Sequence, residues 1–99
     1  MITQTFIRSS LNDPMGIAVD YTTGNIYWTD GGSSGGGRGR IEVASADGSL
    51  RRALIWKDLK RPHLIVLNPA EGHMYWTSSD HHRRSTTLIE RAAMDGSQR

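Results

Sequence analysis

Hydrophobic residues along the chain gather in short runs, and polar or glycine-rich segments separate these runs from one another. Short runs rich in Ile, Val, Thr, Tyr and Trp between turn residues are typical of β-strands. The first half of the chain contains four of them: Met15 to Asp20, Asn25 to Thr29, Arg40 to Ala46 and Arg51 to Trp56. Gly24 and the pair Asp47-Gly48 lie between runs, where glycine supplies the positive φ of a hairpin turn. The pattern therefore predicts an all-β chain of antiparallel strands.

The whole pattern recurs at one fixed offset in the numbering, the offset that separates Pro14 from Pro62 and Tyr27 from Tyr75. Aligning residues 9–51 with 57–99 gives 14 identities in 43 positions, where chance would give roughly two or three, and a fixed period of this length indicates a repeat architecture. The second unit repeats the first strand in "HLIVLN", the second in "HMYWT" and the third in "LIERAAM". Four antiparallel strands per repeat of forty-odd residues are typical of a β-propeller blade.

The offset also divides the chain. Phe6 and Ile7 precede Leu54 and Ile55 by the same offset, so residues 1–10 are predicted to be the last strand of a preceding blade. Residues 11–56 then form one blade, and residues 57–99 form a second blade that lacks its fourth strand. The fold class is a β-propeller fragment of about two four-stranded antiparallel blades.

Neighbouring residues of a strand point to opposite faces, so Tyr27 and Trp28 place an aromatic side chain on each face of the first blade. Tyr75 and Trp76 do the same in the second blade. We expect all four side chains to lie in the core between blades. Because two blades have four faces and only two of them can pack together, we also expect this polypeptide alone to fold poorly or to aggregate through its open edges.

The residues of this repeat resemble a known family. "YWTD" at Tyr27 to Asp30, preceded by "PMGIAVD" and followed by "RIEVASADGSLRRAL", is similar to the YWTD, or class B, repeat of the low-density lipoprotein receptor family and its relatives, nidogen and the epidermal growth factor precursor. Within the family, the sequence is most like that of the receptor-related proteins, which include Wnt co-receptors and the agrin receptor. The residues that carry the motif are Pro14, Gly16, Asp20, Tyr27, Trp28, Thr29, Asp30, Asp47, Gly48, Pro62, Tyr75, Trp76, Thr77, Asp95 and Gly96.

The resemblance implies a parent propeller of six blades beside an EGF-like module, on the extracellular side of the plasma membrane. It implies an endocytic or signalling receptor, without catalysis or cofactor, that binds secreted or cell-surface proteins. The sequence departs from the family pattern at Ser78, which replaces the second Asp, and in the longer loops Gly31 to Arg40 and Ser79 to Leu88. We expect the corner at Ser78 to be looser, because a hydroxyl accepts fewer hydrogen bonds than a carboxylate.

Composition narrows the picture further. The chain has 99 residues, a formal charge of +2, 36% hydrophobic residues and no cysteine, which favours one small domain or a piece of a larger one. It contains neither the pattern of a signal peptide nor an apolar run long enough to span a membrane. The net charge is too small to argue for nucleic acid, and the single "GGGRGR" is more simply a hairpin loop than a nucleic-acid segment.

Strands that alternate in direction place the two long loops and the segment Lys57 to His63 on one rim, which is rich in cations and able to meet an acidic protein. The alternative is a solvated polar edge. The candidate ligand-facing residues are Arg38, Arg40, Trp56, His63, Ser78, His81, His82, Arg83 and Arg84. We expect no metal at His81-His82, because no third ligand recurs at a short spacing. The same histidines leave a pH-dependent release of ligand open.

An enzyme is the alternative function. Propeller hydrolases of the gluconolactonase-like and NHL-like kinds share the "PxGIAVD" opening, and the former hold a divalent cation with acidic residues at the central channel. Asp20 is the candidate for that role, since its counterpart is Asn68. The paired "YWT" phrases favour the non-catalytic receptor class.

Overall fold

The computed structural model describes residues 3–32, 38–80 and 86–99. Within these ranges the chain forms seven strands in two antiparallel sheets and no helix. The first sheet has the order β1-β2-β3-β4 and the second has the order β5-β6-β7. The strands are β1 (Pro14–Val19), β2 (Ile26–Asp30), β3 (Arg40–Ala44), β4 (Arg52–Ile55), β5 (Pro62–Asn68), β6 (His73–Asp80) and β7 (Thr86–Ala93). The all-β prediction and the antiparallel order are confirmed.

The two sheets repeat one another in register. Ile17 pairs with Trp28 in the first sheet, and Ile65 pairs with Trp76 in the second. A bulge follows the proline that opens each sheet, between Pro14 and Ile17 and again between Pro62 and Ile65. Because a shift by one residue turns every side chain to the opposite face, an equal register places equivalent residues on equivalent faces.

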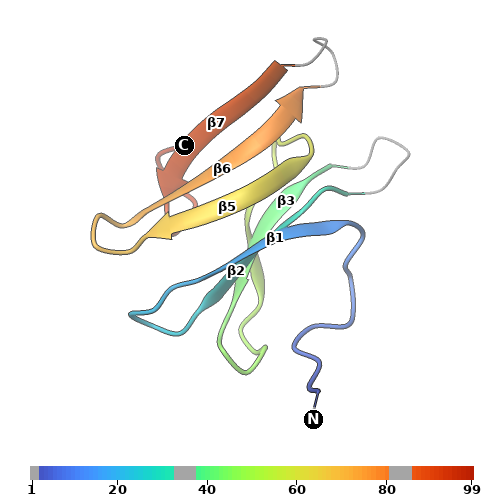
Figure 1. Ribbon diagram of the computed structural model, residues 1–99, viewed down its shortest axis with the longest axis vertical. Coiled ribbons are helices and arrows are strands. Elements are labelled where there is room, and N and C mark those ends of the chain that lie inside the picture. Colours follow the sequence, from blue (N-terminus) through green and yellow to red (C-terminus); the bar gives the residue numbers. More distant parts are fainter. Residues whose placement is uncertain (1–2, 33–37, 81–85) are drawn as a thin grey trace.

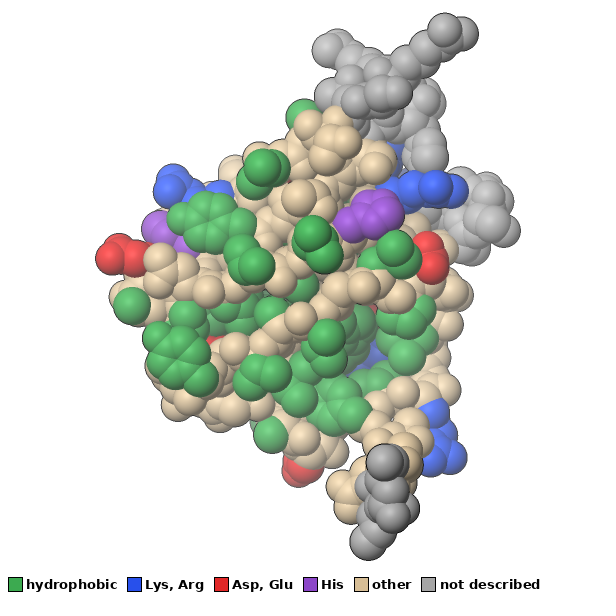
Figure 2. All heavy atoms as spheres, in the orientation of Figure 1, with side chains coloured by type: hydrophobic (Ala, Val, Ile, Leu, Met, Phe, Trp, Pro, Cys, Tyr) green, Lys and Arg blue, Asp and Glu red, His purple; other side chains and the backbone are tan. Residues whose placement is uncertain are grey.

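The core lies between the sheets, where β1 and β2 pack against β5 (Figure 1). Its fully buried members include Ile41, Leu59, Met74 and Trp76, each at most 2% exposed. The outer faces are apolar as well: Ile17, Val19, Leu64, Val66 and Ile89 are among the exposed large hydrophobic residues. Figure 2 shows how hydrophobic side chains fill the middle of one view of the molecule, while most Lys and Arg side chains lie toward its edges.

The strand boundaries differ modestly from the sequence-based ones. The third run was expected to extend to Ala46, but β3 ends at Ala44, because Ser45 already belongs to the turn and donates its N–H to the Ser49 carbonyl. The fourth run was expected from Arg51 to Trp56, but β4 spans only Arg52–Ile55. Strand ends are the least accurate part of a prediction from sequence.

Residues 3–10 form no strand, although they were expected to be the last strand of a preceding blade. They nevertheless pack where such a strand would lie. A Cβ added to Gly48 would come 2.9 Å from the carbonyl oxygen of Phe6, and one added to Gly96 would come 2.7 Å from that of Leu54. Phe6 therefore meets the first sheet as Leu54 meets the second. Strand geometry needs a hydrogen-bonded neighbour, and none of the described strands pairs with this segment.

Candidate functional site

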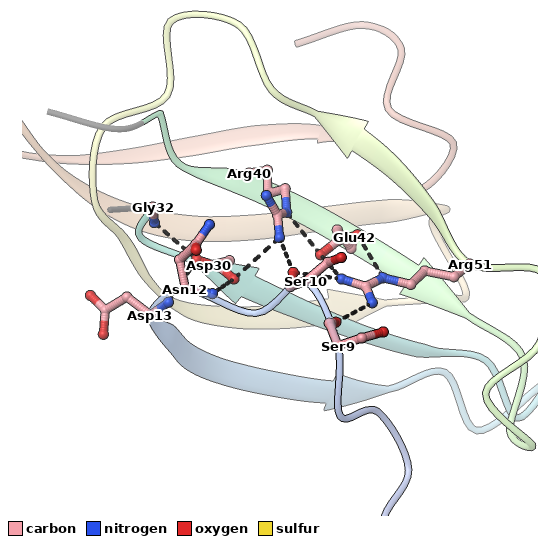
Figure 3. Close-up of polar contacts among 9 residues, drawn as sticks. All are labelled: Ser9, Ser10, Asn12, Asp13, Asp30, Gly32, Arg40, Glu42 and Arg51. Carbon is pink, nitrogen blue, oxygen red and sulfur yellow. Dashed lines mark hydrogen bonds and ion pairs between the residues drawn. The ribbon is translucent and has the colours of Figure 1, made fainter. Parts of the chain in front are cut away.

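Asp30 ties the end of β2 to the segment that leads into β1. Its side chain is fully buried and accepts hydrogen bonds from the backbone N–H groups of Asn12, Asp13 and Gly32, each at 2.9 Å (Figure 3). Burial raises the pKa of the Asp30 carboxyl, but the three N–H groups and the charge of Arg40 outweigh burial and lower that pKa below its ordinary value. Asp30 is therefore a charged strand cap that holds two loops together.

A network of charged side chains continues from Asp30 across the first sheet (Figure 3). Arg40 lies 3.5 Å from the Asp30 carboxylate and donates to Glu42 at 2.9 Å. Arg51 donates to both oxygens of Glu42 and to the carbonyls of Ser9 and Ser10. Burial raises the pKa of Glu42, but the bonds from Arg51 and Arg40 outweigh it and lower that pKa. Arg40 was a candidate for the ligand face, yet its guanidinium is committed to this network.

The second repeat keeps one half of this network and lacks the other. Arg99 donates to Glu90 and to the carbonyls of Lys57 and Asp58, and each partner lies one repeat after its counterpart around Arg51. Ser78 and Leu88 stand at the positions of Asp30 and Arg40. The carboxylate and the cation that neutralises it are thus replaced together.

We expected the corner at Ser78 to be looser, but Ser78 is part of a longer strand. β6 continues to Asp80, and Ser78, Ser79 and Asp80 pair with Leu88, Thr87 and Thr86 of β7. β2 ends at Asp30 instead, where the carboxylate draws in three N–H groups from other segments. Because a serine hydroxyl cannot do so, the ladder continues past Ser78. The Ser78 side chain is 4% exposed and is not free to meet a ligand.

Thr29 and Tyr27 face the second sheet. The Thr29 hydroxyl accepts the N–H of Gly16 at 2.9 Å and donates to the His63 carbonyl at 2.6 Å. The Tyr27 hydroxyl donates to the Met94 carbonyl at 3.3 Å. A Cβ at Gly16 would lie 2.4 Å from the same His63 carbonyl oxygen, so glycine is required for this close approach. These contacts join the two sheets at defined points.

Trp28 and Trp76 lie on the opposite face of their strands from the neighbouring tyrosines. Trp28 meets the edge of Phe6 at a centroid distance of 6.1 Å, and the Arg51 guanidinium lies 5.4 Å from its ring. The Arg99 guanidinium lies 5.8 Å from the ring of Trp76. Both indoles are buried, and neither N–H has an acceptor among the described residues. Each aromatic ring thus contributes burial and cation–π contact rather than a hydrogen bond.

The aspartate and glycine residues of the motif build turns on the rim opposite to the two long loops. Asp20 accepts hydrogen bonds from the backbone and the hydroxyl of Thr22, and the bond from the Thr22 side chain is the main cause of its lowered pKa. Asp47 and Asp95 hold Ser49 and Ser97 in the same way. Gly48 and Gly96 have φ values of 86° and 90°, which side chains rarely adopt. These carboxylates stabilise turns.

The described ends of the two long loops both contact the segment Lys57 to His63, which we expected on the same rim. The N–H of Gly39 donates to the Leu59 carbonyl at 3.0 Å, and the N–H of Ser79 donates to the Lys60 carbonyl at 3.2 Å. Arg38 and Trp56 are exposed, and His63 is half-buried with its carbonyl bound by Thr29. The other candidates lie outside the described residues: His81, His82, Arg83 and Arg84.

Leu59, Arg51 and Arg99 are central to this rim, but we did not single them out from the sequence. Leu59 is 2% exposed beneath the rim, and the two arginines clamp the carbonyls of the segments that precede β1 and β5. Each has an identical counterpart in the other repeat. That identity was a usable signal, whereas residue type alone suggested a solvated surface.

An apolar pocket of about 330 Å³ lies on the outer face of the first sheet. Its position is where a preceding blade would pack. It is lined by Phe6, Ile7, Leu11, Pro14, Met15, Gly16, Ile17 and Trp28. Across residues 3–32, 38–80 and 86–99, no three acidic or histidine side chains come together in a way that could hold a metal ion. The described residues include no helix long and apolar enough to cross a membrane.

Two successive antiparallel sheets with equal register, stacked face to face where β1 and β2 pack against β5, define the chain as a fragment of a β-propeller. The sequence model for the low-density lipoprotein receptor repeat class B matches residues 24–67. Residues 24–67 thus carry a YWTD repeat of this class.

Similar proteins include low-density lipoprotein receptor-related protein 5 of Mus musculus, 44% identical over 67 residues, which are 68% of this chain and 4% of that protein. Another is low-density lipoprotein receptor-related protein 8 of Gallus gallus, 50% identical over 48 residues, which are 48% of this chain and 5% of that protein. Among solved structures, a chain in the crystal structure of a nidogen/laminin complex is 40% identical, with a TM-score of 0.82. That match covers 96% of this chain and 33% of the solved chain. The chain therefore spans a small part of its relatives.

Proposed function

We propose that this chain is part of an extracellular ligand-binding propeller of a low-density lipoprotein receptor-related protein, and that it recognises proteins without catalysis. The observation that carries the proposal is the similarity to receptor-related proteins at 44% and 50% identity. The match to a chain of a nidogen/laminin complex supports protein recognition by a propeller of this kind. In this proposal the loop rim around Leu59 is the face that meets the ligand.

The parent protein in this proposal closes a ring of six blades, with an EGF-like module beside it, on the outer side of the plasma membrane. Its role is that of an endocytic receptor or of a Wnt- or agrin-type signalling receptor. The two outer sheet faces support such a ring, because Ile17, Val19, Leu64 and Val66 are more than half exposed in this chain. Apolar surface of this extent is normally covered by a neighbour.

No observation favours the alternative of a propeller hydrolase. Asp20, the acidic residue that such an enzyme would use, is 5% exposed and binds Thr22 through one of its carboxylate oxygens. Its counterpart Asn68 accepts the N–H of Glu71 in a similar turn. The position thus serves turn formation in both repeats.

Two measurements on the full-length protein test the proposal. Brief proteolysis of intact cells should remove the propeller, as expected of an extracellular module, and the purified ectodomain should bind a secreted protein in a 1:1 complex. Lactone hydrolysis that depends on a divalent cation and disappears in Asp20→Asn would overturn the non-catalytic assignment. A propeller that resists proteolysis until the cells are opened would overturn the extracellular one.

A further inference from the structure

Among the described residues of the rim, exposed cations are densest in the loop Trp56 to Arg61, here called the basic loop. Lys57, Lys60 and Arg61 are exposed, and Trp56 is 51% exposed at its start. Contacts with the rest of the chain hold this loop in place. Leu59, in the middle of the loop, is buried, and Arg99 donates hydrogen bonds to the carbonyls of Lys57 and Asp58.

The rest of the backbone of the basic loop is also fixed. Gly39 donates to the Leu59 carbonyl, and Ser79 donates to the Lys60 carbonyl. Asp58 and Arg61 have φ values of 51° and 43°, in the left-handed region that few side chains other than Asn and Asp adopt readily. A loop fixed in this way loses little conformational freedom when a partner binds.

The first repeat provides an internal comparison. Residues 9–13 form the same loop: Leu11 stands in place of Leu59, Ser10 also has a positive φ of 56°, and Arg51 binds the carbonyls of Ser9 and Ser10. Where the basic loop has Lys57, Lys60 and Arg61, however, this loop has Ser9, Asn12 and Asp13. The fold therefore builds the loop without any of the three cations, so the framework does not explain their presence.

The distribution of carboxylates indicates the sign of a partner. Asp20, Asp47, Glu71 and Asp95 all lie in the turns of the opposite rim, between β1 and β2, β3 and β4, β5 and β6, and after β7. The basic loop lies at the other rim and contains one carboxylate, Asp58, and the equivalent loop of the first repeat adds the exposed Asp13. Arg38 adds a further exposed cation next to Gly39, which contacts the loop. Separation of charge between two rims orients an approaching charged partner.

We propose that the basic loop is a docking element for an acidic protein segment with an apolar side chain, in which Lys57, Lys60 and Arg61 meet the carboxylates and Trp56 packs on the apolar residue. Exposed aromatic side chains beside cations are typical of the anchors of protein interfaces. Trp56 favours a protein segment over a sulfated glycan, because an aliphatic side chain offers the indole more apolar surface than a charged sugar ring does. This inference rests on the proposed function as a protein-binding module.

The experiment uses the full-length protein and a fluorescein-labelled peptide with four glutamates around a central leucine. Binding is followed by fluorescence anisotropy at low and moderate salt. The triple variant K57S/K60N/R61D, which copies the first repeat, should weaken binding by about tenfold or more and flatten the salt dependence. R8S/R52S/R91S removes three cations elsewhere and is the matched control, for which we expect a change of less than about twofold.

Trp56 has its own test. W56A should weaken binding of the leucine peptide about fivefold, and it should have little effect on the same peptide with glycine in place of leucine. Thermal unfolding of each variant shows whether it is folded, and R61D alone replaces the triple variant if that variant unfolds. A lysine peptide of reversed charge should not bind.

Equal binding by the parent protein and K57S/K60N/R61D would overturn the proposal. So would loop-dependent binding of heparin without binding of the peptide, because the partner would then be a glycan. Loss of the peptide interaction would leave the proposed function standing if the purified ectodomain still bound its secreted protein through other rim residues.

Discussion

At the end of β2, Asp30 and Arg40 form a pair that the second repeat replaces with Ser78 and Leu88. A buried carboxylate is stable only when hydrogen bonds and a counter-charge compensate for its lost hydration. Once the carboxylate is replaced by a hydroxyl, a half-buried arginine at the other position would keep as its counter-charge only the glutamate that it shares with the neighbouring arginine. The joint replacement therefore follows from electrostatics at the scale of single residues.

Asp30→Ser should lower the free energy of unfolding by roughly 3–5 kcal/mol, because it leaves three backbone N–H groups without their acceptor and removes one of the two carboxylates beside Arg40. The double variant D30S/R40L, which copies the second repeat, should recover about 1–3 kcal/mol of that loss. Denaturant unfolding of the full-length protein measures both values. Glu71→Ser, at an exposed turn position, is the control. Strict additivity of the two single changes would contradict the coupling that we infer.

The pair also predicts how stability depends on pH. The pKa values of Asp30 and Glu42 are lowered in the folded chain, so their contribution is fully present above the unfolded values of about 4 and is lost as the pH falls through the folded values. Melting temperatures measured between pH 7 and pH 2 should fall below about pH 4. The fall should be smaller in D30S/R40L. A melting curve with the same acid dependence in both proteins would remove Asp30 from this explanation.

At the scale of elements, the junction between the sheets depends on β1 lying close to β5. Thr29 bridges the two strands through one hydroxyl, and Gly16 permits the approach. Leu64 is the counterpart of Gly16 in the second repeat, and it is 69% exposed. A blade that packs on the outer face of β5 must therefore meet the Leu64 side chain. On its other face, β5 packs against the bare backbone at Gly16 of β1.

Thr29→Val keeps the shape of the side chain but removes both hydrogen bonds, and it should lower the free energy of unfolding by about 1–3 kcal/mol. Thr87→Val is the matched control, because Thr87 is an exposed residue of β7, and we expect a change below about 0.5 kcal/mol. Denaturant unfolding of the full-length protein measures both variants. Similar losses for the two would show that the bridge between β1 and β5 contributes nothing of its own.

At the scale of the whole molecule, each sheet has one face in the common core and one face open. Met15, Ile17 and Val19 of β1 and Leu64 and Val66 of β5 lie between 47% and 69% exposed. Repeat units of this kind become stable when neighbours cover both faces. The isolated chain contains too few neighbours to do so.

A polypeptide of these 99 residues alone should therefore aggregate or unfold without cooperativity. Circular dichroism during heating, combined with light scattering of the eluted species, measures this. Extending the polypeptide by further repeats of the parent propeller should restore a cooperative transition. A sharp, reversible transition of the monomeric 99-residue chain would show that two sheets suffice.

Much of this protein follows from local sequence, because side-chain alternation and turn glycines act within a strand or a hairpin. The repeat period, the strand pairing, and the opposite directions of Tyr27 and Trp28 are all local or repeated features. Contacts between distant segments are not encoded in such patterns. Only the tertiary structure showed that Arg40 turns inward to Asp30, that Ser78 is buried within an extended β6, and that Leu59 and Arg99 fix the basic loop. Each depends on which backbone groups a folded neighbour brings within hydrogen-bonding or packing distance.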